Sequence, residues 1–332
     1  MKFRFYHFFL QHFTYYIKIL QMKKVKISVV TPVYNDWDCL KFLIKEIKLI
    51  SNDKFSIDKI IVVNDGSQEN CPELIYNDNK IQIINLTTNL GHQRAICIGL
   101  CYVNDNIKSS NFIIVMDSDG EDKPSDIPLL IEIAKKNSLN IVFAKRNKRS
   151  ESFIFKLGYF IYKKVFKTLT KTEISFGNFS AIPIMKIQNI ISNPDIWNHF
   201  SASIIKSRLK YNTMSTDRGS RYFGQSKMNF TNLVSHGLSS ISIFIDIIIV
   251  RLLIVNSIAV LFSFIMLIIL LLIKVFSSFQ IPGWTPVYTL AIFNILIFSL
   301  IFTLLLVLIQ LNNRSVLKKS PKSYYRDFIL DE

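Results

Sequence analysis

The stretch Asn111–Pro124, NFIIVMDSDGEDKP, sets the fold of this chain. Its apolar run, Phe112–Met116, is bounded by polar residues, a pattern typical of a buried strand. Four carboxylates then follow within six residues: Asp117, Asp119, Glu121 and Asp122. Side chains this close repel one another unless water or a cation screens them, and their oxygens suit a hard divalent ion. The stretch therefore predicts a strand that ends in a metal site, with a solvated acidic turn as the alternative.

Strands and helices alternate at regular spacing around this stretch, which predicts a mostly parallel sheet. The other predicted strands are Lys26–Thr31, Lys59–Val63, Ile81–Asn85 and Asn140–Ala144. Polar residues follow the strands at Asp36, Asp65, Asn89–Gly91 and Asp117–Asp122. In such sheets ligands bind at the carboxyl ends of the strands. Because the chain has neither G-x-G-x-x-G nor G-x-x-x-x-G-K-[ST], carboxylates with a metal are expected to handle any phosphate.

Two later segments are basic. The loop Asp217–Lys227, DRGSRYFGQSK, holds three cations among small residues and could cradle phosphate oxygens. A solvated basic loop is the alternative. The segment Lys156–Thr170 places lysines among aromatic and aliphatic residues at helical spacing. It is typical of a helix in a membrane interface, with an ordinary surface helix as the alternative.

Two uncharged apolar runs near the C-terminus, Leu252–Ile273 and Val287–Ile309, predict membrane spans. About 22 helical residues at ~1.5 Å each cover ~33 Å, enough for a bilayer core. The segment that follows, from Asn313, is rich in Lys and Arg, whereas the connection between the runs holds one Lys. The positive-inside rule then places the N-terminal domain and the basic tail in the cytoplasm.

Composition agrees with a membrane protein that meets anionic partners. The 332 residues include 40 basic and 24 acidic side chains, a net charge of +16, and half are hydrophobic. Because the apolar residues gather after about residue 241, a membrane and phosphate-bearing substrates are favoured over nucleic acid. The four cysteines form no C-x-x-C pair and are expected to be reduced packing residues. Residues 1–21 either form an interfacial helix or precede a natural start at Met22.

Together these motifs resemble the family 2 glycosyltransferases of GT-A fold, and among them the polyprenyl-phosphate glycosyltransferases related to dolichyl-phosphate mannosyltransferase. The resemblance covers roughly residues 24–312. It rests on TPVYND (31–36), VVNDGS (62–67), NLGHQRAICIGL (89–100), DSDGED (117–122), RYFGQSKMN (221–229) and the paired apolar spans. No Trp lies in the Q-x-x-R-W motif usual in processive synthases.

The resemblance implies a fold and a division of the chain. The fold class is α/β: a mostly parallel GT-A (Rossmann-like) sheet domain, then interfacial helices and a two-helix transmembrane hairpin. The expected parts are an extension (1–23), the GT-A domain (24–228), an interfacial helix (229–250), two transmembrane helices within 251–311 and a basic cytoplasmic tail (312–332). It further implies a multi-pass protein of the inner (plasma) membrane with a cytoplasmic catalytic domain; a homo-oligomer is left open.

The resemblance also implies roles for individual residues. The nucleotide-sugar residues are Pro32, Tyr34, Asp36, Asp65 and Asp117, with Asp65 at the base. Mg²⁺ or Mn²⁺ is expected on Asp117, Asp119 and Glu121; the family usually has Leu-Gln where this chain has Gly120-Glu121. The residues expected to meet the acceptor or donor phosphates are Arg218, Arg221, Ser226 and Lys227. The expected catalytic residues are Asp119, Asp122, Arg221 and Lys227.

Three functions remain in competition at this point. The first is inverting transfer of a hexose from a nucleotide sugar, with UDP-sugars favoured, to polyprenyl (undecaprenyl) phosphate for cell-envelope glycans. This acceptor is already anionic and needs no strong base. The second is a single addition to a hydroxyl of a lipid-linked or surface polysaccharide, where Asp122 would serve as base. The third is a membrane-anchored sugar-nucleotide binder without turnover.

Overall fold

A computed structural model describes residues 24–137, 139–146, 163–173, 176–224, 230–276 and 283–330. The chain divides into two compact units. The sheet unit comprises the described residues up to 146, those from 176 to 243 and those from 319 to 330. The hairpin unit comprises residues 163–173 and the described part of 244–318. The expected extension (1–23) and residues 156–162 of the expected helix at 156–170 lie outside the described residues.

The sheet unit is built on a seven-stranded sheet with the order β3-β2-β1-β4-β6-β5-β7. Its strands are β1 (Val25–Val33), β2 (Phe55–Asn64), β3 (Ile81–Asn85), β4 (Phe112–Val115), β5 (Ile141–Arg146), β6 (Ser180–Pro183) and β7 (Tyr211–Thr216). All neighbours pair in parallel except β6, which runs antiparallel to both β4 and β5. The predicted mostly parallel sheet is therefore confirmed.

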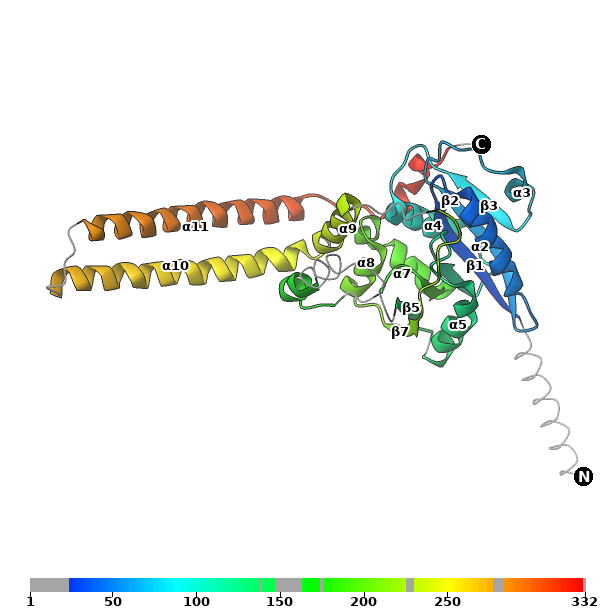
Figure 1. Ribbon diagram of the computed structural model, residues 1–332, viewed down its shortest axis with the longest axis horizontal. Coiled ribbons are helices and arrows are strands. Elements are labelled where there is room, and N and C mark those ends of the chain that lie inside the picture. The colour runs from blue at the N-terminus through cyan, green and yellow to red at the C-terminus, as the bar shows by residue number, and fades with distance from the viewer. Residues whose placement is uncertain are drawn as a thin grey trace, which may run out of the picture. The chain divides into compact units, whose positions relative to one another are not determined.

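Helices cover both faces of this sheet (Figure 1). They are α2 (Trp37–Leu49), α3 (Glu73–Tyr76), α4 (His92–Asn106), α5 (Ile127–Lys136), α7 (Ile187–Ile191) and α8 (Phe200–Lys206). A further helix, α9 (Phe230–Ser242), comes after the basic loop along the chain. One core layer joins α2 and α5 to side chains such as Val29 and Val62. The other joins α4, α7 and α8 to Val30 and Ile61. Because successive strand residues point to opposite faces, each apolar strand serves both layers.

Two strands escaped the sequence analysis, β6 and β7. The four residues of β6 are too few to display a period, and β7 reads YNTMST, with polar residues at most positions. Both lie between residue 146 and the basic loop that begins at Asp217, where the sequence carries no recognised motif. Strand β7 leads directly into the basic loop at 217–224, and its neighbour β5 ends at Arg146. The pairing of these two strands therefore brings the basic loop and Arg146 to the same edge of the sheet.

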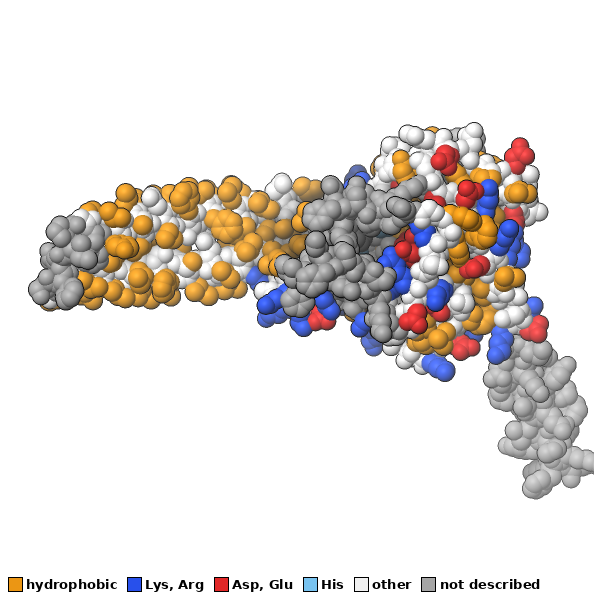
Figure 2. Space-filling model, in the orientation of Figure 1, with side chains coloured by type: hydrophobic (Ala, Val, Ile, Leu, Met, Phe, Trp, Pro, Cys, Tyr) orange, Lys and Arg blue, Asp and Glu red, His pale blue; other side chains and the backbone are white. Residues whose placement is uncertain are grey.

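The hairpin unit contains a helix at residues 163–170 and two long helices, α10 (Ile245–Phe276) and α11 (Trp284–Ser315). The apolar stretches of the two long helices have mean hydropathies of 3.0 and 2.9 and are only 6% buried. Apolar side chains cover the two helices in Figure 2. Both helices are thus long and apolar enough to cross a membrane, as predicted.

Polar contacts within this unit join its helices. Asn256 Nδ2 of α10 donates to Ser299 O at 3.0 Å and to Thr303 Oγ1 at 2.7 Å, both on α11. Such interhelical hydrogen bonds hold apolar helices in register. Arg251 Nη1 donates to the carbonyls of Thr168 and Leu169, at 2.9 and 2.6 Å, and so caps the C-terminal end of the 163–170 helix.

Candidate active site

The acidic turn after β4 is folded onto itself. Asp122 Oδ2 accepts a hydrogen bond from the Asp117 amide at 3.1 Å, and Asp119 Oδ1 accepts one from the Glu121 amide at 3.0 Å. Gly120 has φ +89°, a backbone conformation that favours glycine. A side chain there would also meet the ring of Tyr222, 2.4 Å from the position of its Cβ. Gly120 thus makes room for the aromatic ring of the basic loop.

The basic loop after β7 lies against this turn. The Gly219 amide donates to Glu121 O at 2.9 Å and the Tyr222 amide donates to Asp119 O at 3.1 Å. A Cβ at Gly219 would lie 2.4 Å from the backbone oxygen of Gly120, so only glycine permits this approach. Two segments about 100 residues apart in sequence are therefore joined backbone to backbone at the carboxyl end of β4.

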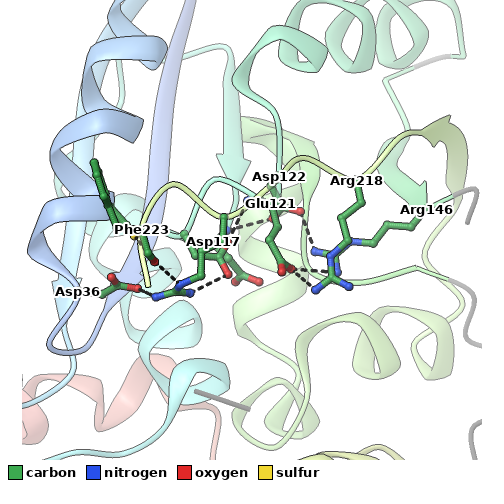
Figure 3. A network of polar contacts seen from close by, with 10 residues as sticks. Asp36, Asp117, Glu121, Asp122, Arg146, Arg218 and Phe223 are labelled. Carbon is green, nitrogen blue, oxygen red and sulfur yellow. Dashed lines mark hydrogen bonds and ion pairs between the residues drawn. The ribbon is translucent and has the colours of Figure 1, made fainter. Parts of the chain in front are cut away.

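Three arginines pair with carboxylates of the turn (Figure 3). Arg221 bridges Asp36 and Asp119, with Nη1 3.3 Å from Asp119 Oδ2. Arg218 pairs with Glu121. The sequence analysis assigned Arg218 and Arg221 to phosphate binding; the structure brings both to the acidic turn.

The third arginine, Arg146 at the end of β5, was missed by the sequence analysis. Its Nη2 lies 3.1 Å from Asp122 Oδ1 and its Nη1 lies 3.5 Å from Glu121 Oε2. A signal was present, because Arg146 follows a predicted strand at the end where ligands bind. The predicted strand ended at Ala144, and the two basic residues after it, Lys145 and Arg146, were not connected with the site.

Burial governs the ionisation of the acidic turn. Burial, reinforced by the charge of Asp119, raises the pKa of Asp117 to about 6. Burial and the charge of Asp117 likewise raise the pKa of Asp122 to about 6, although Arg146 opposes the rise. Burial also raises the pKa of Asp119. The turn thus concentrates negative charge that its own arginines offset only in part.

The chemistry of this turn fits a divalent cation. Buried carboxylates whose ionisation is disfavoured gain from a nearby positive charge, and their oxygens are the ligands that Mg²⁺ and Mn²⁺ prefer. The structure does not gather the three expected ligands: among the described residues, no group of three acidic, His or Cys side chains is placed to hold a metal. Asp119 and Glu121 instead face Arg221 and Arg218. A cation held by Asp117, Asp119 and Glu121 requires the last two to turn from their arginines.

The expected nucleotide residues collect at the carboxyl ends of β1 and β2. Pro32 lies in β1 opposite Val63, Tyr34 is 40% exposed just beyond the strand, and Asp36 meets Arg221. Asp65 is buried, and its two oxygens accept hydrogen bonds from the amides of Leu90 (2.7 Å) and Gly91 (2.9 Å). Asp65 therefore ties the end of β2 to the start of α4. Burial raises its pKa, against the effect of the two amides.

A buried polar cluster next to Asp117 was also not foreseen. The side chain of Asn178 lowers the pKa of Asp117, against the effect of burial, and its Oδ1 accepts from Gln93 Nε2 at 3.1 Å. Gln93 Oε1 accepts from the Phe200 amide at 2.7 Å. The cluster connects the acidic turn to α4 and α8. Two further expected site residues, Ser226 and Lys227, lie outside the described part of the chain.

Comparison with known proteins agrees with this geometry. Residues 28–189 match Glycosyl transferase family 2. An uncharacterised glycosyltransferase of Bacillus subtilis, YkcC, is 25% identical over 295 residues, 86% of this chain and 87% of that protein. An undecaprenyl-phosphate 4-deoxy-4-formamido-L-arabinose transferase of Photorhabdus laumondii is 27% identical over 226 residues, 65% of this chain and 66% of that protein.

The fold has a relative of known structure as well. Glucosyl-3-phosphoglycerate synthase of Mycobacterium tuberculosis, solved with Mn²⁺, uridine diphosphate and glucosyl-3-phosphoglycerate, superposes with a TM-score of 0.50. The match covers 67% of this chain and 80% of that one at 12% identity, so it concerns the fold alone. Residues 28–189 of this chain thus form a Glycosyl transferase family 2 domain, and the protein is a glycosyltransferase.

Proposed function

We propose that this glycosyltransferase is a multi-pass membrane enzyme that moves a hexose from a UDP-sugar to a polyprenyl phosphate, undecaprenyl phosphate in bacteria, for modification of cell-envelope glycans. One observation carries the proposal: an acidic turn and three arginines meet at the strand ends of a chain with two helices of membrane length. The P. laumondii relative acts, by its name, with undecaprenyl phosphate, and the M. tuberculosis structure holds uridine diphosphate and Mn²⁺.

Connectivity supports the membrane arrangement. The chain leaves the sheet unit after Ile243 and rejoins it at Lys319, with α10 and α11 between. Two crossings return a chain to the side from which it started, so the sheet unit needs only one compartment. The basic residues after α11 favour the cytoplasm as that compartment under the positive-inside rule.

The donor side follows from the acidic turn. Asp117, Asp119 and Glu121 would hold Mg²⁺ or Mn²⁺, which would stabilise the charge of the departing nucleotide diphosphate. If Asp119 held the cation, Nη1 of Arg221 would lose its partner there and could bind a phosphate oxygen, while Nη2 would still pair with Asp36. Pro32, Tyr34, Asp36 and Asp65 border the space at the ends of β1 and β2, where the nucleoside would lie.

The acceptor side follows from charge. A phosphate oxygen of the acceptor forms a bond to the anomeric carbon as the bond to the nucleotide diphosphate breaks, which inverts the configuration. An acceptor phosphate is anionic near neutral pH, so no protein base is needed. Asp122 instead holds the turn together, because one of its oxygens accepts from the Asp117 amide and the other accepts from Arg146. Because both oxygens are engaged, a phosphate acceptor is favoured over a hydroxyl that needs Asp122 as base.

The test uses membranes that contain the full chain, incubated with undecaprenyl phosphate, Mn²⁺ and each common labelled nucleotide sugar in turn. We expect label in a chloroform-soluble lipid with at least one UDP-sugar. The Asp119→Asn variant should lose most of this product, since it weakens the cation site. Absence of lipid-borne label with every donor would refute the proposal, and label in a glycan without a lipid phosphate would favour the hydroxyl acceptor.

A further inference from the structure

The last described residues fold back onto the sheet unit. We call residues 319–330 the C-terminal strap; the sequence analysis had treated them as part of a basic tail. Near the start of the strap, Ser320 Oγ donates to Ile191 O at 2.7 Å. The strap contains the short helices η4 (Pro321–Ser323) and η5 (Tyr325–Phe328). Figure 1 shows this segment, in red, beside α4.

The strap is anchored in the core through Tyr325. This side chain is only 2% exposed and packs in the layer that contains α4. Its hydroxyl donates to Asp105 Oδ2 of α4 at 2.8 Å, and Arg326 Nη2 lies 3.0 Å from the same oxygen. A buried aromatic ring with a satisfied hydroxyl is a strong and specific attachment.

A second attachment is aromatic. The ring of Trp197 lies 5.2 Å from that of Tyr324 and 5.1 Å from that of Phe328, measured between ring centroids. On α4, the guanidinium of Arg94 lies 5.6 Å from the centroid of Trp197. Aromatic and cation–π contacts at these distances are favourable. The strap thereby contacts Trp197, whose ring also contacts Arg94 in the first turn of α4.

The end of the strap pairs with the chain just after β3. The Thr87 amide donates to Phe328 O at 2.9 Å, the Leu330 amide donates to Asn85 O at 2.8 Å, and Leu86 lies opposite Ile329. Because β3 is the edge strand of the sheet, the strap supplies hydrogen bonds that the sheet does not.

The strap contacts the start of segment 86–91, and residues Asn64 and Asp65 at the end of β2 contact the same segment. The Leu86 amide donates to Asn64 O at 2.9 Å, and the Asp65 carboxylate accepts hydrogen bonds from the amides of Leu90 and Gly91. Gly66 approaches the same segment closely: a Cβ there would lie 2.7 Å from the Asn89 nitrogen. Segment 86–91 is thus clamped between the strap and Asn64–Gly66.

From this clamp we infer that the C-terminal strap is a positioning element for the donor site. It fixes segment 86–91, and with it Asp65 and the start of α4, so that the nucleotide pocket is formed before the nucleotide binds. The inference rests on the proposed function, which places the nucleoside beside Asp65. A preformed pocket lowers the ordering cost of binding, so a loosened strap should weaken donor binding more than it slows the transfer step.

The test is a double variant of the full-length protein in detergent, Tyr325→Phe with Arg326→Gln, which keeps the buried ring and removes both bonds to Asp105. We expect amide hydrogen exchange in residues 86–91 to become about tenfold faster, as for loss of a hydrogen bond to a charged group. The KM for the nucleotide sugar should rise about tenfold while kcat stays within about twofold. The control is Lys322→Gln, a strap residue that contacts Gln188 and should change neither quantity.

An engineered cysteine pair tests whether attachment of the strap to segment 86–91 is by itself enough for slow exchange and low KM. Leu86 and Ile329 face each other between the two strap hydrogen bonds, the spacing at which a disulfide can form. Leu86→Cys with Ile329→Cys, added to the double variant, should restore slow exchange and low KM when oxidised and lose both when reduced.

Unchanged exchange in the double variant would overturn the inference, as would faster exchange with an unchanged KM. Failure of the proposed function is distinguishable, because the exchange measurement needs no substrate. If the unmodified protein protects residues 86–91 but binds no nucleotide sugar, the proposed function is refuted, together with the donor role of the strap.

Discussion

Asp122 and Asp117 are joined across the acidic turn: the Asp122 carboxylate accepts a hydrogen bond from the Asp117 amide at 3.1 Å. This bond closes the turn and brings the half-buried carboxyl group of Asp117 close to the buried one of Asp122. The charge of Asp117 contributes to the raised pKa of Asp122. Arg146 lowers the pKa of Asp122, but not enough to bring it back to its usual value. The site is therefore arranged at a cost in stability, a common property of functional sites.

Asp117→Asn should raise stability and lower activity. Burial disfavours the charged form of Asp117, so a neutral amide of the same shape relieves a cost of the folded state. We expect the melting temperature of the metal-free protein at pH 7.5 to rise by roughly 2–4 °C, and activity to fall by about 100-fold. Thermal unfolding and the lipid-product assay measure the two effects. Asp38→Asn, at an exposed position on α2, is the control and should alter neither. A lower melting temperature for Asp117→Asn would contradict this account.

The stability of the metal-free protein should depend on pH in a defined direction. Asp117 and Asp122 have folded-state pKa values of about 6, above their usual value. A raised pKa contributes stability that is complete below the unfolded-state pKa and is lost as the pH rises through 6. With a chelator present, the contribution of this pair to the melting temperature should fall between about pH 4 and pH 7. Saturating Mn²⁺ should remove the fall, and Asp117→Asn should reduce it. If Asp117→Asn and the unmodified protein show the same dependence of melting temperature on pH, Asp117 does not contribute to that dependence as predicted.

Glu121→Gln should change the response to metal. Glu121 pairs with Arg218 and lies 3.5 Å from Arg146, so the substitution removes a negative charge beside both arginines, of which Arg146 keeps Asp122 as a partner. It also removes one carboxylate from the expected ligand set. The Mn²⁺ and Mg²⁺ concentrations for half-maximal activity should each shift at least about threefold, and by different factors, because the two ions differ in their preference for charged ligands. Identical metal titrations for Glu121→Gln and the unmodified enzyme would argue against Glu121 as a ligand.

Gly219→Ala should displace the basic loop. The new Cβ would lie 2.4 Å from the Gly120 backbone oxygen, which cannot move without distorting the acidic turn. We expect activity to fall at least about tenfold through misplacement of Arg218 and Arg221, since small displacements in an active site are costly. The matched control is Gly177→Ala, where a Cβ would meet nothing within 4 Å. If both variants keep full activity, the close packing of the loop on the turn is not required.

Much of the fold was readable from local pattern. The five strands β1 to β5, the helices α2, α4 and α5 between them, and the two long apolar helices were all predicted, because burial gives neighbouring residues a recognisable apolar pattern. The acidic turn was placed correctly at the end of β4 for the same reason. Strand β6 was missed because four residues show no period and its antiparallel insertion depends on β4 and β5.

The sequence by itself determined which chemistry the chain carries: carboxylates at strand ends, a basic loop, and two apolar helices. Only the tertiary structure decided which groups meet. In the folded chain Arg221 pairs with Asp119, and Arg146 pairs with Asp122. The amides of Leu90 and Gly91 donate hydrogen bonds to Asp65. It also returned the strap to α4 and the end of β3. These contacts join residues from 24 to more than 200 positions apart. Hydrophobic period is a local property, whereas contacts of this kind follow from the packing of whole layers, which no single stretch encodes.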